Sequence, residues 1–136
     1  MPEKKRRVII DTNLWVSFLL SRNLTTLDGV LGSSKLTLLF SQELLDEFLE
    51  VIQRPKFSTL VSKTAISDLL NTLRSKAEFI EVKSEVSHCR DEKDNFLLSL
   101  AKDGSATHLI TGDKDLLVIA KFEKTHIITL TEFLKG

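Results

Sequence analysis

The sequence contains little cysteine, glycine or proline. Its 136 residues include one cysteine, five glycines and two prolines. The single cysteine, Cys89, excludes an intramolecular disulfide and a multi-cysteine zinc site, and it suits a reducing compartment such as the cytoplasm. The low glycine and proline content argues against fibrous and low-complexity chains. The composition therefore indicates a globular domain that is stabilised by its own apolar core.

The sequence also lacks an excess of charge of either sign. Nineteen lysine and arginine residues balance nineteen aspartate and glutamate residues. Proteins that coat DNA usually carry a clear positive excess, so this balance argues against that class. The balance remains compatible with an enzyme that gathers carboxylates around metal ions.

Long hydrophobic runs are absent as well. The uncharged run at residues 12–21 is about half of the ~20 residues that a membrane-spanning helix needs. The basic start, residues 4–7, is followed by an apolar stretch that Asp11 interrupts, with no small-residue cleavage site. We therefore expect no membrane association and a mature cytoplasmic protein, with the basic start as a solvated tail.

Short apolar segments alternate with segments of helical periodicity along the whole chain. This alternation predicts a mainly parallel sheet covered by helices on both faces, because each crossover helix returns the chain for another parallel strand. No linker or repeat divides the chain, so we expect one domain over residues 1–136. The five expected strands are 7–10, 36–40, 78–82, 107–111 and 127–129, and the expected helices follow Asp11 and lie at 41–54, 64–77, 94–102, 113–120 and 130–134.

Acidic residues recur where strands of this sheet are expected to end. Asp11 follows the first strand, Asp113 and Asp115 follow the fourth, and Asp94 opens the helix before it. Glu47 lies in the second helix, at the margin of its apolar stripe. Ligands of open parallel sheets bind at the carboxyl ends of the strands, so these acids are candidates for one common site.

Three of these acids have an ordinary structural interpretation. Asp94 suits a first helical turn and Asp113 suits a helix N-cap. Glu47 shares a helix face with Glu43 and Glu50, which is typical of a solvated face. Asp11 is different, because a carboxylate that directly follows a buried strand must be compensated by a cation, a metal or hydrogen bonds.

Four blocks of the sequence, taken in order, resemble the PIN-domain nucleases, and in particular the branch of toxins from toxin–antitoxin systems. The resemblance runs nearly from end to end. The matching blocks are Val8–Ser17, Ser41–Phe48 with Arg54–Phe57, Arg90–Asn95 and Thr111–Leu117.

The resemblance implies a three-layer α/β/α domain that binds Mg²⁺ or Mn²⁺ and hydrolyses single-stranded RNA. It also implies an antitoxin protein as partner and a homodimer. Carried over by position, the implied catalytic residues are Asp11, Glu47, Asp94 and Asp113, the implied metal ligands are Asp11, Asp94, Asp113 and Asp115, and the implied supports are Asn13 and Thr111. The family commonly has proline at the position of Glu92, a difference that removes no carboxylate.

The residue types agree with this chemistry independently. Several carboxylates at one edge would repel one another unless divalent cations neutralised them, and hard cations prefer oxygen ligands. Basic residues near the acidic blocks are weaker candidates for holding the RNA backbone. They are Arg22, Arg54, Lys56 and Lys114.

Two alternatives remain open from the sequence. A phosphatase of the haloacid-dehalogenase type also places an aspartate after its first strand, but its signature needs an acid two residues later, where this chain has Asn13. The other alternative is a binding module that has kept the fold without catalytic activity.

Overall fold

The computed structural model describes residues 6–21, 36–87, 89 and 92–135. In these residues six strands form one sheet in the order β3-β2-β1-β4-β6-β5. The strands are β1 (Arg6–Ile10), β2 (Leu36–Phe40), β3 (Ala77–Phe79), β4 (His108–Ile110), β5 (Lys121–Phe122) and β6 (Thr125–Ile128). The helices are α1 (Thr12–Ser21), α3 (Gln42–Ile52), α4 (Pro55–Ser58), α5 (Lys63–Lys76), α6 (Glu92–Asp103), α7 (Lys114–Leu117) and α8 (Leu130–Lys135).

The expected mainly parallel sheet is confirmed, with one strand more than the five expected. Strands β3, β2, β1, β4 and β6 pair in parallel, and only β5 runs antiparallel, against β6. The additional strand β5 forms a hairpin with β6. It has two residues, which is too few for an alternation of apolar and polar residues to be visible in the sequence. The expected strand at 78–82 is also shorter, because its partner β2 ends at Phe40, opposite Phe79.

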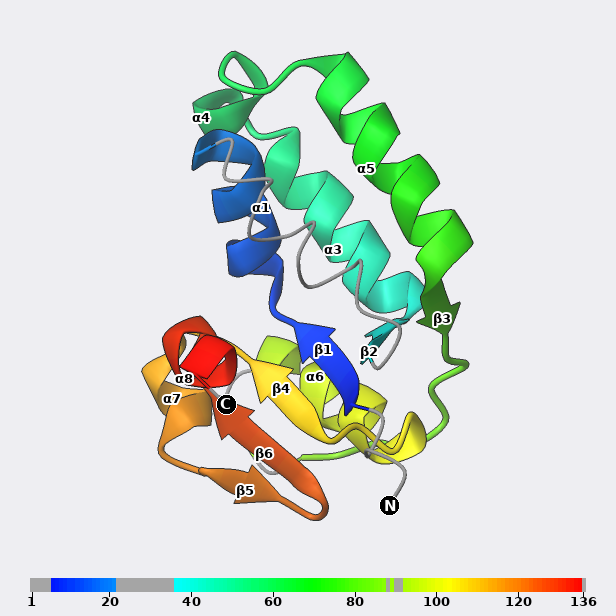
Figure 1. Cartoon of the computed structure of the whole chain (residues 1–136), viewed down its shortest axis with the longest axis vertical. Helices are drawn as coiled ribbons and strands as arrows, with labels where there is room; N and C mark the ends of the chain where they lie inside the picture. The colour runs from blue at the N-terminus through cyan, green and yellow to red at the C-terminus, as the bar shows by residue number, and fades with distance from the viewer. Residues whose placement is uncertain (1–5, 22–35, 88, 90–91, 136) are drawn as a thin grey trace.

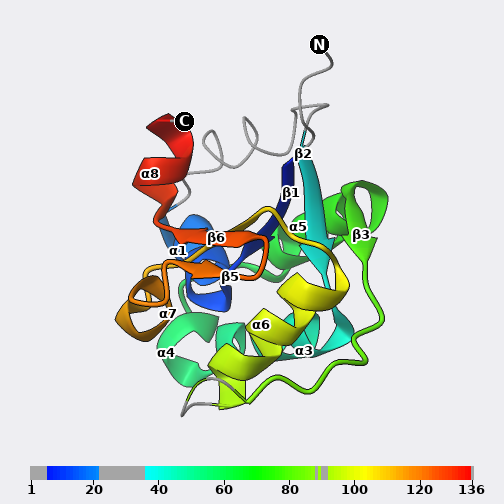
Figure 2. The ribbon, with the colours of Figure 1, turned by 90° about the horizontal axis from the view of Figure 1, so that it is seen from below.

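Helices cover both faces of the sheet, which confirms the expected three layers (Figures 1 and 2). The ring of Trp15, in α1, packs against Phe40 of β2 with ring centroids 5.6 Å apart. Later in the chain, the backbone of Gly104, directly after α6, lies against the Leu39 side chain. Successive side chains of a strand point to opposite faces, so α1 and α6 lie on opposite sides of β2.

Local sequence explains where the main helices begin. Ser41 caps α3 by accepting a hydrogen bond from the Leu44 backbone N–H at 3.1 Å, and Ser62 caps α5 through Ala65 in the same way. Helix α3 ends at Ile52, and Pro55 occupies the first turn of the short helix α4, where its missing N–H is harmless. The expected interruption at Pro55 is therefore present as a boundary between two helices.

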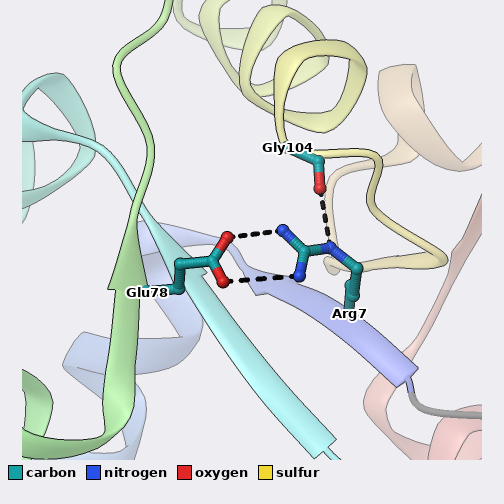
Figure 3. A network of polar contacts seen from close by, with 3 residues as sticks. All are labelled: Arg7, Glu78 and Gly104. Carbon is teal, nitrogen blue, oxygen red and sulfur yellow. Dashed lines mark hydrogen bonds and ion pairs between the residues drawn. The ribbon is translucent and has the colours of Figure 1, made fainter.

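An ion-pair network ties together segments that lie far apart in the sequence (Figure 3). The Arg7 guanidinium, on β1, donates to both carboxylate oxygens of Glu78 on β3, the shorter contact being 2.6 Å. Its Nε also donates to the Gly104 carbonyl oxygen at 2.8 Å. The pKa of Glu78 is lowered, chiefly by the hydrogen bonds from Arg7. This network lies on the α6 side of the sheet and fixes the turn that leads from α6 into β4.

Within the described residues, no helix has the length and hydrophobicity needed to cross a bilayer. The longest of these helices, α5, has 14 residues and exposes much of its surface. This finding agrees with the expectation from the sequence for this part of the chain.

Candidate acidic metal site

The site lies at the carboxyl ends of β1 and β4, the two neighbouring strands at the centre of the sheet. After β1 the chain adds β2 and β3 on one side of this pair, and after β4 it adds β6 and β5 on the other side. The direction in which strands are added therefore reverses between β1 and β4. The Asp11 backbone N–H donates to the Ile110 carbonyl oxygen at 3.0 Å, which places Asp11 beside the end of β4. Ligands of parallel sheets bind at such a reversal.

The Asp11 carboxylate is almost fully buried, with 8% of the residue exposed. It accepts a hydrogen bond from the Thr111 hydroxyl at 2.7 Å and further bonds from the backbone N–H groups of Thr12 and Asn13. Burial is the largest influence on its pKa and raises it, Asp113 adds repulsion in the same direction, and these hydrogen bonds act against the rise. A cation beside Asp11 would favour its charged form.

Thr111 links Asp11 to the second acidic segment. Its hydroxyl donates to Asp11 and accepts from the Asp113 backbone N–H at 3.0 Å, and its side chain is 1% exposed. Asp113 in turn caps α7, because its carboxylate accepts from the Asp115 backbone N–H at 2.9 Å. The capping role that the sequence suggested for Asp113 is thus present together with its position in the acidic site.

Three carboxylates gather next to this chain of hydrogen bonds. Asp94, Asp113 and Asp115 each offer an oxygen atom, and these oxygens all lie within 4.8 Å of one another. Asp94 is buried in the first turn of α6, Asp113 is partly buried and Asp115 is exposed. Folding therefore brings together residues from before and after β4.

The donor set of this cluster fits a hard divalent cation. Its members are carboxylates without histidine or cysteine, and Mg²⁺ and Mn²⁺ prefer oxygen donors whereas zinc commonly takes nitrogen and sulfur. The charges of the cluster and of Asp11 thus favour cation binding.

Glu47 is held at the α1 side of the site. The Thr12 hydroxyl donates to Glu47 Oε2 at 3.1 Å, which connects α1 with α3. Glu43 and Glu50 on the same face of α3 are exposed, whereas Glu47 is half-buried. Glu47 is therefore not part of a uniformly solvated acidic face, which the sequence alone had favoured as its ordinary interpretation.

The remaining predicted residues have varied surroundings. Asn13 is exposed, and its backbone N–H bonds the Asp11 carboxylate. Arg54 pairs with Glu50 at 2.9 Å, and the Lys56 ammonium lies 5.2 Å from the Phe57 ring centroid. Lys114 is exposed in α7, between two acids of the cluster in sequence. Arg22 lies outside the described residues.

Sequence reasoning did not single out Thr12 or the role of Asn95. The Asn95 side-chain amide bonds both backbone groups of Cys89, accepting from its N–H at 2.7 Å and donating to its carbonyl at 2.8 Å. This pair of bonds ties Cys89 to α6 at the residue next to Asp94. Threonine and asparagine are so often surface or capping residues that position alone gave no signal for either role.

Two comparisons with known proteins bear on the chain. A family model described as PIN domain matches residues 7–115. These residues include Asp11, Glu47 and the three acids of the cluster. An uncharacterized protein of Methanocaldococcus jannaschii is 30% identical over 126 residues, which cover 86% of this chain and 77% of that protein.

Proposed function

Because the chain belongs to the PIN-domain family, whose members are nucleases that use divalent metal ions, we propose that it is an endoribonuclease that hydrolyses single-stranded RNA with Mg²⁺ or Mn²⁺. The observation that carries the proposal is the convergence of Asp94, Asp113 and Asp115 at the edge where Asp11 is buried. The three carboxylates of the cluster offer oxygen donors within 4.8 Å of one another, which supports a shared cation.

In this proposal Asp94, Asp113 and Asp115 hold the cation, and Asp11 contributes through its connection to Asp113. A divalent cation in such a site activates water and neutralises charge on the phosphate and the leaving oxygen. Thr111 holds the Asp11 carboxylate close to the Asp113 backbone, because its hydroxyl is hydrogen-bonded to both. Because Asp94 is buried in a regular helix, its carboxylate is presented from a rigid element.

We assign Glu47 to orienting the attacking water, since its carboxylate reaches the α1 side of the site and can accept a hydrogen bond. We assign Lys114 to the RNA backbone, because it is exposed next to the acidic cluster in sequence and carries a positive charge. Arg54 and Lys56 contribute at most from the periphery, since Arg54 is engaged with Glu50 and Lys56 with Phe57.

The test is cleavage of an end-labelled single-stranded RNA with Mn²⁺, with Mg²⁺ and with EDTA. The variants are Asp94→Asn and Asp113→Asn, and the matched control is Asp68→Asn, which removes the same charge from an exposed position on α5. We expect cleavage by the wild type and the control in Mn²⁺, at least a hundredfold loss in both site variants, and no cleavage in EDTA. Equal cleavage by all four proteins would reject the assignment.

The same preparations address the two alternatives from the sequence. Hydrolysis of a phosphate monoester, with phosphate trapped covalently on Asp11, would instead indicate a phosphatase. A protein that neither cleaves RNA nor binds Mn²⁺ would be a silent binding module.

The biological part of the proposal is that this nuclease is a cytoplasmic toxin that forms a homodimer and is neutralised by an antitoxin protein. It is supported by the resemblance of the four sequence blocks to toxins of this kind. Induced expression is expected to arrest bacterial growth, and Asp94→Asn is expected to prevent the arrest. Normal growth during production of active wild-type enzyme would contradict the toxin role, and light scattering of the purified protein tests the dimer.

A further inference from the structure

We propose that Thr12 is a positioning residue that holds the Glu47 carboxylate at the acidic site. This inference rests on the proposed nuclease function and gives a role to a residue that lies in the first sequence block and outside the acidic cluster. The observation behind it is the hydrogen bond from the Thr12 hydroxyl to Glu47 Oε2. The bond joins α1 to α3 through two residues that are 35 positions apart in sequence.

Thr12 lies on a rigid part of the molecule. It is the first residue of α1, directly after Asp11, and is 3% exposed. The junction before it is fixed on one side by the bond from the Asp11 N–H to Ile110 and on the other by Trp15, whose Nε1–H donates to the Ile10 carbonyl at 3.0 Å. The Trp15 side chain is fully buried. The Thr12 hydroxyl therefore has a well-defined location.

Glu47 is more buried than Glu43 and Glu50, its acidic neighbours on α3. A glutamate side chain has several rotatable bonds, and a half-buried one at a helix surface can adopt many rotamers unless a contact selects one. Its backbone is already fixed, because α3 is capped by Ser41 and buries Phe48 completely. The Thr12 hydroxyl adds a constraint on the carboxylate itself.

The chemistry of the contact suits a carboxylate that must remain an acceptor. Threonine has one O–H donor, and this donor points to Glu47 Oε2, so Glu47 accepts this bond as a carboxylate. Thr111 does the same for Asp11 on the β4 side. Two threonine hydroxyls thus orient two acids, one on each side of the junction between β1 and α1.

The experiment is a double-mutant cycle of Thr12→Val with Glu47→Ala, together with Thr12→Ser. The control is Ser17→Ala, which removes an exposed hydroxyl of α1 that donates to the Asn13 carbonyl oxygen at 3.0 Å. The measurements are kcat and KM for single-stranded RNA in Mn²⁺, and Mn²⁺ affinity by calorimetry. Circular dichroism checks folding, and Thr12→Ala replaces the valine variant if valine does not fold.

We expect Thr12→Val to lower kcat about tenfold to a hundredfold, the usual effect of losing a partner that orients a metal-site group. KM should change much less, Thr12→Ser should recover most of the loss, and Ser17→Ala should resemble the wild type. In the Glu47→Ala background, Thr12→Val should have no further effect, because the acceptor of the Thr12 hydroxyl is then absent. Full activity of Thr12→Val, or independent effects of the two substitutions, would overturn the inference.

The measurements also separate this inference from the proposed function. A wild type that cleaves RNA, with no effect of Thr12→Val, leaves the nuclease intact and rejects the positioning role. A wild type that binds Mn²⁺ without cleaving RNA rejects the nuclease, and the positioning role then stands if both substitutions weaken Mn²⁺ binding without adding to each other. A wild type that does neither rejects both.

Discussion

Replacing Asp11 by asparagine is expected to stabilise the folded chain in the absence of metal, while removing its response to metal. The Asp11 carboxylate is 8% exposed, and burial together with Asp113 raises its pKa. Asparagine is nearly isosteric and keeps an acceptor oxygen for the Thr111 hydroxyl, which now lies 2.7 Å from the carboxylate. The substitution therefore removes the cost of a buried charge and keeps the main hydrogen bond.

The gain in the free energy of unfolding should be about 0.5–2 kcal/mol at pH 7 in EDTA, the usual range of single stabilising substitutions. For a domain of this size, 1 kcal/mol corresponds to roughly 3–5 °C in Tm. Saturating Mn²⁺ should reverse the order, because ligand at a hundred times its Kd stabilises the wild type by about 2.7 kcal/mol and the variant much less.

The sign of the pH dependence follows from the raised pKa. Since the folded state binds the Asp11 proton more tightly than the unfolded state, wild-type stability rises relative to Asp11→Asn as the pH falls through the folded pKa. The difference between the two proteins should be largest at neutral pH and small below the unfolded value. Urea unfolding in EDTA at several pH values measures it, with Asp68→Asn as the control for a surface charge.

The reasoning would be refuted by either of two results. One is an Asp11→Asn protein that is less stable than the wild type at pH 7 in EDTA. The other is a stability difference that stays constant from neutral to acidic pH. A variant that gains from Mn²⁺ as much as the wild type does would show that Asp11 takes no part in cation binding.

Three further substitutions have defined outcomes in urea unfolding. Thr111→Val should lower the free energy of unfolding by about 1–3 kcal/mol, because it leaves the Asp113 N–H without its acceptor. Thr111→Ser should lower it clearly less, and equal losses would contradict the role of the hydroxyl. Glu78→Gln should cost less than about 1 kcal/mol at neutral pH, since the pair with Arg7 is partly exposed. Because the pKa of Glu78 is lowered, that cost should disappear as the pH falls through the folded pKa, and a cost that persists in acid would exclude the ion pair as its source. Gly104→Ala should cost about 1–3 kcal/mol, because an added Cβ would lie 2.9 Å from a core leucine atom and 3.0 Å from a backbone carbonyl oxygen; unchanged stability would show that the turn relaxes easily.

Periodicity in the sequence was sufficient for the layers of the fold. The apolar runs at β1, β2 and β4 and the helical stripe of α3 are strong local signals, since each is buried against the same core. The hairpin strand β5 was missed because two residues carry no period, and the strand at 78–82 was overextended because its length is limited by β2. Pairing with a partner strand decided both, and pairing is a non-local property.

For the acidic site, the sequence identified the type of residue and the expected edge of the sheet. It correctly placed Asp11 and Thr111 at the ends of two strands, but it could not tell that these strands are neighbours. The assignment of all these residues to catalysis or metal binding remains a prediction. Capping by Asp113 and a place in the cluster are compatible, so the sequence could not have chosen between them.

The sequence by itself determined the alternation of strands and helices, the neutrality of the chain and the acids available for a site, because all of these depend on nearby residues or on composition. Only the tertiary structure decided that Asp94 lies close to Asp113 and Asp115. It also decided that Thr111 is hydrogen-bonded to both Asp11 and Asp113, and that Thr12 is hydrogen-bonded to Glu47. These contacts depend on which strands lie side by side and on the rotamers that packing permits. Both are set by the whole core at once, and no local stretch of sequence encodes them.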